Sequence, residues 1–258
     1  MTYAKSEKSK GALIFASNTN ETDYSMIAGR SARLIERHLG IPTTVVEKKS
    51  QSTNQRYSTE HTRFVEWNNK GRFSAFDESP YDVTLLIDAD YLVFDDRLSM
   101  VMNTVSDYAI MRNNIFLPSN VVGDRLGEYS FETSWATVVV FEKTEKARLL
   151  FDMVGRVQDH YSYYRSLYNI SHTNYRNDYA FTIADRMLNG YCEDSRTQIP
   201  WIMTTLQGSI NDIELQPNGM IVRFDETALV LPRQDVHVLG KKFLQSDRFG
   251  EIVEAACA

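Results

Sequence analysis

The chain has 258 residues, of which 43% are hydrophobic, and its formal net charge is −6 at pH 7. This length accommodates one large α/β domain or two small ones, and the hydrophobic fraction is enough for a sizeable core. The acidic balance excludes a uniformly basic protein that coats nucleic acid, although a local basic groove remains compatible with it. Because no apolar run approaches 18 residues, we expect no membrane span.

A single domain is expected after a short N-terminal segment. Residues 1–10 are polar and contain lysine, which predicts a flexible segment, and no repeat, low-complexity tract or long linker divides residues 11–258. The two cysteines, Cys192 and Cys257, lie far apart and form no Cys-x-x-Cys pair or zinc spacing. We therefore expect free thiols in a reducing compartment, and a cytoplasmic protein.

The first elements predict a βαβ unit. The apolar run at 11–17 is typical of a strand, and residues 24–39 carry apolar side chains at helical spacing after a capping Thr22 or Asp23. Residues 43–46 are β-branched and predict a second strand. Strand, helix and strand in this order imply a parallel sheet.

Further strands and helices alternate along the rest of the chain, which predicts an α/β fold with a mostly parallel central sheet flanked by helices. The buried strand at 83–90 is the most apolar of them. The other expected segments are a loop or flap at 48–62, a helix at 63–76 interrupted at Gly71, a helix at 97–105, a strand at 108–111, a loop-like region at 113–133, a strand at 135–141, helices at 144–157 and 177–188, and short strands at 199–203, 220–224, 229–231 and 236–239.

Two aspartates, Asp88 and Asp90, end the most apolar run of the chain. Ionised carboxylates at the end of a buried strand are costly unless a cation or hydrogen-bond donors meet them. Residues two apart in an extended segment share a face, so the pair can converge on one divalent ion, which prefers oxygen ligands. The alternative is a pair of aspartates that cap a turn, because Asp-x-Asp is short and common.

Two further positions, in the C-terminal half of the chain, are candidates for metal binding or catalysis. His237 precedes Gly240, Lys241 and Lys242; an imidazole ligates transition metals, and the ammonium groups suit a diphosphate. The alternative there is a loop histidine beside a solvated lysine pair. Asp178 opens a predicted helix, where it either caps the helix or faces a substrate hydroxyl or a developing positive charge.

Polar and aromatic groups suggest where a nucleotide and an acceptor could bind. Ligands of doubly wound sheets sit beyond the carboxyl ends of the strands, so the segment from Ser17 to Tyr24 could hydrogen-bond and stack on a nucleobase. Ordinary turn chemistry is the alternative. The stretch 156–176 is rich in tyrosine, arginine and histidine, which bind sugars, bases and phosphates unless the tyrosines pack inward.

Together these segments resemble a GT-A glycosyltransferase, and most closely the family 8 pattern of glycogenin and galactosyltransferase-like enzymes. The strongest match is SPYDVTLLIDADYLVFDDRL at 79–98. The order of the other matching pieces also agrees, across residues 11–243: Ala16-Ser17-Asn18 with Asp23-Tyr24, Lys70 to Phe76, Trp135 to Phe141 with the helix after it, Asn177-Asp178-Tyr179, and His237-x-x-Gly240.

This resemblance implies a GT-A, Rossmann-like fold and transfer of a sugar from a nucleotide sugar, a UDP-sugar first of all, to a hydroxyl with retention of configuration. Asp88, Asp90 and His237 would hold Mn²⁺ (or Mg²⁺) against the donor diphosphate, and Asp178 with Lys241 or Lys242 would be catalytic. The donor-binding positions it implies are Ser17, Asn18, Asp23, Tyr24, Lys70, Arg72 and Ala89. The acceptor-binding positions it implies are Trp135, Tyr164, Arg165, Tyr175, Arg176 and Tyr179.

The chain departs from the family pattern in three places. Tyr179 replaces a glutamine, and Trp135-Ala136-Thr137 replaces an asparagine and glycine pair. Near the C-terminus, Lys241 and Lys242 come earlier after Gly240 than the family lysine does, and the family Pro-Trp is absent. The compact size and the tyrosine-rich insertion also resemble phage-encoded glycosyltransferases. A hydroxymethylated or already glycosylated pyrimidine in phage DNA is therefore a candidate acceptor beside a carbohydrate, and host cytoplasm a candidate location.

Two rival interpretations belong to other functional classes. The segment 87–92 also resembles the first motif of haloacid-dehalogenase phosphatases, although a complete βαβ unit precedes it here. A catalytically silent GT-A-fold binding protein is the third interpretation, and Tyr179 is its best support.

Overall fold

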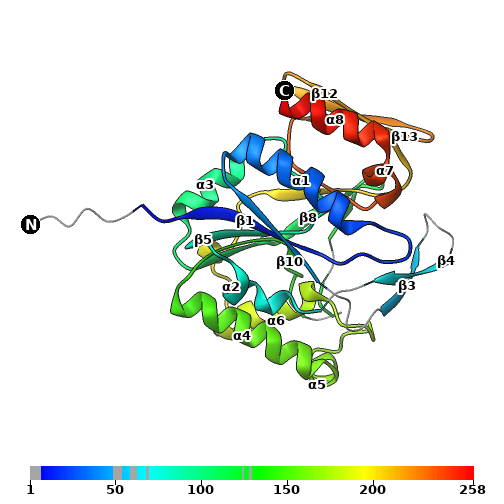
Figure 1. The fold of residues 1–258 in the computed structure, drawn as a ribbon. Coiled ribbons are helices and arrows are strands. Elements are labelled where there is room, and N and C mark those ends of the chain that lie inside the picture. Colours follow the sequence, from blue (N-terminus) through cyan, green and yellow to red (C-terminus); the bar gives the residue numbers. More distant parts are fainter. Residues whose placement is uncertain (1–6, 49–53, 59–62, 68–69, 124, 128–129) are drawn as a thin grey trace, which may run out of the picture.

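The computed structural model describes residues 7–48, 54–58, 63–67, 70–123, 125–127 and 130–258. Its helices are α1 Tyr24–Leu39, α2 Ala75–Glu78, α3 Arg97–Thr104, α4 Glu145–Asp159, α5 Tyr161–Leu167, α6 Asn177–Leu188, α7 Lys241–Gln245 and α8 Asp247–Cys257. Figure 1 shows a central sheet between two layers, with α1 and α8 on one side and α2, α4 and α6 on the other. The expected α/β class, with helices flanking a sheet, is confirmed.

The first sheet has the strand order β2-β1-β5-β10-β7. Its strands are β1 Lys10–Ala16, β2 Thr43–Glu47, β5 Val83–Ile87, β7 Tyr108–Met111 and β10 Trp135–Glu142. β1 pairs in parallel with β2 and β5, whereas β10 runs antiparallel to β5 and β7. The βαβ unit is therefore present, and the strand that leads to Asp88 lies at the middle of the sheet.

Helix α1 has the boundaries that its sequence signals predict. The Asp23 carboxylate accepts a hydrogen bond from the Met26 N–H at 3.0 Å, which satisfies a free donor of the first turn. Gly40 ends the helix in the left-handed region at φ 65°, where glycine is favoured. The helices expected at 97–105, 144–157 and 177–188 are also present, within two residues of those bounds.

The core lies on both faces of β5, whose five residues are all buried. Alternate residues of a strand face opposite sides of a sheet. Leu85 and Ile87 accordingly join the apolar cluster beneath α1, while Leu86 joins the cluster beneath α4 and α6. Burial of this kind contributes about 25 cal/mol per Å² of apolar surface, so the strand is held firmly where the aspartates begin.

Directly after those aspartates the chain enters the first strand of a second sheet. Its order is β6-β15-β11-β8-β9, and its strands are β6 Tyr91–Leu92, β8 Asn113–Leu117, β9 Val121–Val122, β11 Ile202–Leu206 and β15 Val236–Val238. The segment 88–90 is thus the junction between the two sheets. A third, antiparallel sheet packs against α8 and consists of β12 Ile210–Gln216, β13 Gly219–Phe224 and β14 Ala228–Pro232.

The helix expected over 63–76 is wrong for most of its length. Arg63–Trp67 forms strand β4, which pairs antiparallel with β3 (Asn54–Ser58) inside the region expected to be a loop or flap. The alternation of polar and apolar residues in RFVEW has the period of a strand, and this period prevails. A 3₁₀ turn at Arg72–Ser74 and the short α2 follow Gly71, whose φ is 86°.

Other expectations need smaller corrections. The region 113–133, expected to be loop-like, contains β8 and β9, and the tyrosine-rich stretch contains α5. Of the expected N-terminal segment, residues 1–6 lie outside the described residues, while the Ser9 N–H donates to Asp82 at 2.9 Å. Cys192 and Cys257 are free thiols. Within the described residues, no helix has both the length and the apolar character needed to cross a membrane.

Candidate active site

The Asp-x-Asp segment is fixed where the chain leaves one sheet for the other. The Asp88 N–H donates to the Thr137 carbonyl of β10 at 3.0 Å, and the Val238 N–H of β15 donates to the Asp90 carbonyl at 2.8 Å. Between them the Tyr91 N–H closes a turn on the Asp88 carbonyl at 3.1 Å. The backbone is therefore held from both sheets, and the two carboxylates have fixed starting points.

His237 reaches the same place from the C-terminal part of the chain. Antiparallel pairing of β15 with β6 sets His237 opposite Tyr91, one residue beyond Asp90. The His237 Nε2 lies 3.5 Å from Asp90 Oδ2, and one donor atom from each of Asp88, Asp90 and His237 lies within 4.8 Å of the others. The expected convergence of these three side chains is confirmed.

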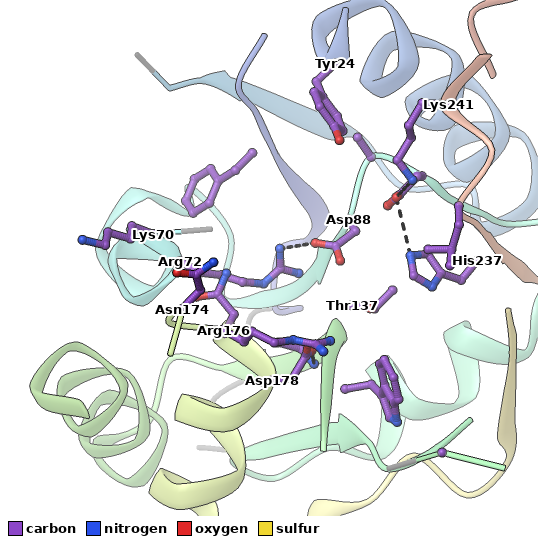
Figure 2. Close-up of a pocket in the computed structure, with 18 of the residues that line it drawn as sticks. Tyr24, Lys70, Arg72, Asp88, Thr137, Asn174, Arg176, Asp178, His237 and Lys241 are labelled. Atoms are coloured by element: carbon purple, nitrogen blue, oxygen red, sulfur yellow. Dashed lines mark hydrogen bonds and ion pairs between the residues drawn. The ribbon is translucent and has the colours of Figure 1, made fainter. Parts of the chain in front are cut away.

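Two cations of the chain lie against the carboxylates. Lys241 Nζ forms an ion pair with Asp90 and donates to the Val238 carbonyl at 2.8 Å, and the buried Arg72 forms an ion pair with Asp88 (Figure 2). Burial favours the protonated form of Asp90, but Lys241 and His237 together outweigh it and hold the pKa of Asp90 well below its usual range. Burial raises the pKa of Asp88, and Arg72 opposes that shift.

The donor set fits a divalent cation. Two carboxylates and one imidazole nitrogen are the mixed oxygen and nitrogen ligands that first-row divalent ions such as Mn²⁺ accept. Because the three ligand atoms lie within 4.8 Å of one another, small side-chain movements suffice for one ion to touch all three at metal–ligand distances of about 2.0–2.2 Å. The observation supports divalent metal binding at this site without selecting the metal.

Asp178 faces the cavity from the first turn of α6, on the side away from Lys241 in Figure 2. Its Oδ1 accepts the Ala136 N–H at 3.0 Å, and its Oδ2 accepts from Arg176 Nη2 at 2.7 Å. Arg176 in turn lies over the Trp135 ring at 6.0 Å. The carboxylate is thus held in one orientation by a backbone amide and a guanidinium, which is more than a helix cap requires.

These groups line one cavity of about 690 Å³. In the view of Figure 2, Tyr24 and Lys241 lie at one end, Arg176 and Asp178 at the other, and Asp88 between them. Of the donor positions expected from the sequence, five line this cavity: Ser17, Tyr24, Lys70, Arg72 and Ala89. The described lining residues do not include Asn18, which accepts the Ser25 N–H at 2.9 Å, or Asp23, which caps α1.

Of the acceptor positions expected from the sequence, some line the cavity and others do not. Trp135 and Arg176 line the cavity. Tyr164, Tyr175 and Tyr179 are buried in the cluster beneath α4 and α6. The inward-packing alternative given for the stretch 156–176 therefore holds for Tyr164 and Tyr175, and Arg165 donates to the Ile170 carbonyl at 3.1 Å. Lys242 is exposed on α7 and is not among the described lining residues, unlike Lys241.

Several lining residues were not anticipated. Lys48 follows β2, and the rule that ligands sit beyond the carboxyl ends of parallel strands could have found it. Thr137 lies in β10, and Val121 and Val122 lie in a strand that the sequence did not predict. Asn174 comes from the loop before α6, where no periodic pattern marks which side chains face a site, whereas His172 of the same loop belongs to the stretch 156–176 that was expected to bind ligands.

No protein-family model and no curated protein matches this chain. Among solved structures it is similar to the apo form of the glycosyltransferase GlyE of Streptococcus pneumoniae TIGR4, with 14% identity and a TM-score of 0.34 over 74% of this chain; it spans only 45% of that chain. Mouse xyloside xylosyltransferase 1 gives 9% identity and a TM-score of 0.40, with 71% of this chain and 83% of that chain covered. The inositol-1-phosphate CTP transferase of T. maritima gives 10% and 0.37, with 96% of both chains covered. At such scores the likeness does not decide the activity, which has to be argued from the site.

Proposed function

We propose that this chain is a metal-dependent glycosyltransferase that moves a sugar from a nucleotide-sugar donor, a UDP-sugar first of all, to a hydroxyl acceptor. The observation that carries this proposal is the convergence of Asp88, Asp90 and His237 on the wall of a cavity that Arg72 and Lys241 also line. The cavity volume of about 690 Å³ is within the range of small-molecule sites. Carboxylates, imidazole and cationic donors together suit a divalent ion and a diphosphate.

The charge of the cavity supports an anionic donor. Among the described lining residues, lysine and arginine outnumber aspartate, although the whole chain has a net charge of −6. Such a local excess raises the concentration of a polyanion in the cleft. The cations are Lys48, Lys70, Arg72, Arg176 and Lys241, and the anions are Asp88, Asp90 and Asp178.

Different residues along the cavity have different roles in this proposal. A cation bound by Asp88, Asp90 and His237 supplies Lewis-acid stabilisation of the charge on the leaving nucleoside diphosphate. Arg72 and Lys241 donate to phosphate oxygens beside it, which stabilises the same charge electrostatically. Ser17 and Tyr24, beyond the end of β1, bind the nucleobase by a hydrogen bond and by stacking.

Asp178 acts at the sugar. Because Ala136 and Arg176 fix its carboxylate, it orients the sugar and stabilises positive charge that develops at the reacting carbon. We assign retention of configuration, as the family 8 resemblance implies.

The acceptor enters beside Trp135 and the loop that carries His172 and Asn174. An aromatic ring can pack against the face of a sugar or of an extruded nucleobase. Carbohydrate hydroxyls and an oligonucleotide with hydroxymethylated pyrimidine are therefore the two acceptors to compare. A nucleic-acid acceptor predicts binding that weakens steeply with salt, whereas a neutral carbohydrate does not.

The test follows release of UDP from UDP-sugars with Mn²⁺, with water or a trial sugar as acceptor. We expect the wild type to release UDP and free or transferred sugar, and Asp88→Asn and Asp90→Asn to reduce turnover by roughly 10³-fold. Asp77→Asn is the matched control, since Asp77 is an exposed carboxylate on α2 that pairs with Arg148 at 3.2 Å. It should leave turnover unchanged.

The products separate the rival activities. Release of UMP with a sugar phosphate indicates attack on the diphosphate instead of the sugar carbon, and phosphate release from a generic phosphate ester indicates a phosphatase. Either result without UDP release would overturn the proposal. If the protein binds added UDP in the presence of Mn²⁺ but forms no UDP from any UDP-sugar, the catalytically silent binding protein is favoured.

A further inference from the structure

A line of buried polar side chains runs behind His237 across three neighbouring strands. β11 pairs in parallel with both β8 and β15, and its Thr205 is in register with His237. Thr205 Oγ1 lies 3.1 Å from His237 Nδ1, and it donates to Asn114 Oδ1 of β8 at 2.7 Å. Asn114 and Thr205 are fully buried. Burying polar side chains costs free energy unless they form hydrogen bonds with one another. The hydrogen bonds from His237 through Thr205 to Asn114 therefore restrict these side chains to one arrangement.

The donor and the acceptor of each hydrogen bond in this line can be assigned. The Thr205 hydroxyl has one hydrogen, and Asn114 accepts it. Thr205 Oγ1 must therefore accept a hydrogen bond from His237, which puts the imidazole proton on Nδ1. In the neutral ring the other nitrogen, Nε2, then carries a lone pair. It lies 3.5 Å from Asp90 Oδ2, with which a protonated ring would form an ion pair instead. In the metal-free chain the Lys241 ammonium pairs with this same Asp90 oxygen, and the Nε2 lone pair remains available as a ligand for a divalent cation.

We propose that Thr205 is a positioning residue that, with Asn114, holds His237 in the Nδ1–H tautomer and directs Nε2 to the cation site shared with Asp88 and Asp90. This inference rests on the proposed function for the role of the cation, whereas the tautomer is a property of the metal-free chain. Partners behind a metal-binding histidine typically change metal affinity by about 10- to 100-fold when they are removed. Thr205 touches neither substrate nor metal, so its effect passes through His237.

The test measures the tautomer and the metal affinity separately. Nitrogen NMR of ¹⁵N-histidine-labelled, metal-free protein distinguishes the Nδ1–H from the Nε2–H form, and His237→Gln assigns the signal among the five histidines. Mn²⁺ affinity is measured without donor, from the electron paramagnetic resonance of free Mn²⁺. The variants are Thr205→Val, which removes the hydroxyl at similar shape, and Thr205→Ser, which keeps it. Thr204→Val is the matched control, because Thr204 is the neighbouring buried threonine of β11.

We expect the wild type, Thr205→Ser and Thr204→Val to show the Nδ1–H form and the same Mn²⁺ affinity. Thr205→Val should lose the preference for Nδ1–H and bind Mn²⁺ about 10- to 100-fold more weakly, with its folding checked by thermal denaturation. An Nε2–H form in the wild type, which a reversed Asn114 amide would produce, overturns the inference. So does a Thr205→Val protein with wild-type tautomer and affinity. Undiminished Mn²⁺ binding by Asp90→Asn would instead overturn the proposed metal site and leave the tautomer result standing.

Discussion

Lys241 and Asp90 form a buried ion pair although they lie 151 positions apart in the chain. Lys241 is the first residue of α7, three residues after β15 ends, and Asp90 immediately precedes β6. Because β6 and β15 are paired, the C-terminal segment delivers His237 and Lys241 to the same carboxylate. The pair therefore neutralises Asp90 in the metal-free chain and places an ammonium group beside the candidate metal ligands.

Lys241→Met should destabilise the protein strongly. It leaves the Asp90 carboxylate buried without its main partner, and breaking one side of a buried pair typically costs about 3–5 kcal/mol. Urea denaturation at pH 7 measures the change in the free energy of unfolding. Lys242→Met is the matched control, since Lys242 is exposed on the same helix, and it should change stability little.

The double variant Asp90→Asn with Lys241→Met checks the cause. If the loss comes from an unpaired buried charge, the double variant should be more stable than Lys241→Met alone, because neither charge remains. A double variant that is as unstable as the sum of the two single variants would contradict this account and point to lost packing.

Tyr24→Ala should weaken UDP binding without impairing the metal site. Stacking of a base on an aromatic side chain is worth about 1–3 kcal/mol, so the dissociation constant of UDP should rise by roughly 5- to 150-fold. Calorimetry of UDP binding with Mn²⁺ measures it. Mn²⁺ affinity alone should be unchanged, and Tyr163→Ala, at an exposed tyrosine of α5, should bind UDP normally. Equal loss for both tyrosine variants would move the nucleobase elsewhere.

Local patterns predicted those parts of the fold that local interactions determine. α1 carries an apolar stripe and a cap at each end, and its bounds were predicted correctly. The buried run 83–87 with two aspartates after it located the turn at the junction of the sheets. These signals lie within about 20 residues of sequence, where period and capping are sufficient evidence.

The pairings of the second sheet escaped prediction because they are remote, although strands were expected at 199–203 and 236–239, at or near β11 and β15. β8 lies in a stretch with few β-branched residues, and it is held by β11, about 90 positions further on: Asn114 is in register with Met203. The relay from His237 to Asn114 exists only through that pairing. The tyrosines of 161–179 escaped for another reason: Tyr164 and Tyr179 are as suited to a core as to a sugar, and only packing shows that they are buried.

Asp235→Asn should change how stability depends on pH. The Asp235 carboxyl is buried, and burial with the nearby Asp95 raises its pKa to about 7, although the Phe94 and Asp95 N–H groups oppose this. In the unfolded chain the pKa of an aspartate carboxyl is about 3.9. Since the folded state holds its proton more tightly, stability is greatest below the unfolded value and falls as pH rises to about 7.

Asparagine can keep both backbone hydrogen bonds through Oδ1 and has no charge to bury. Asp235→Asn should therefore match the wild type near pH 4 and exceed it at pH 8, by a few kcal/mol at most. Urea denaturation across pH 4–8 provides the measurement, and Asp96→Asn, at a solvent-exposed aspartate next to α3, is the control. Parallel pH profiles for wild type and Asp235→Asn would show that Asp235 titrates normally.

Asp178→Asn should separate catalysis from donor binding. The amide side chain of this variant can still accept the Ala136 N–H, but it lacks the charge that pairs with Arg176 in the cavity wall. Donor affinity should stay near wild type, because in the proposed site the diphosphate is bound by Arg72, Lys241 and the cation at Asp88, Asp90 and His237, none of which this change removes. Turnover should fall by roughly 10²–10³-fold, since stabilisation of positive charge at the reacting carbon is gained only in the transition state. Steady-state rates with varied UDP-sugar give the split between kcat and KM, and Asp152→Asn, at an exposed aspartate of α4, should leave both unchanged. A raised KM with normal kcat would make Asp178 a binding group for the donor and remove it from the chemical step.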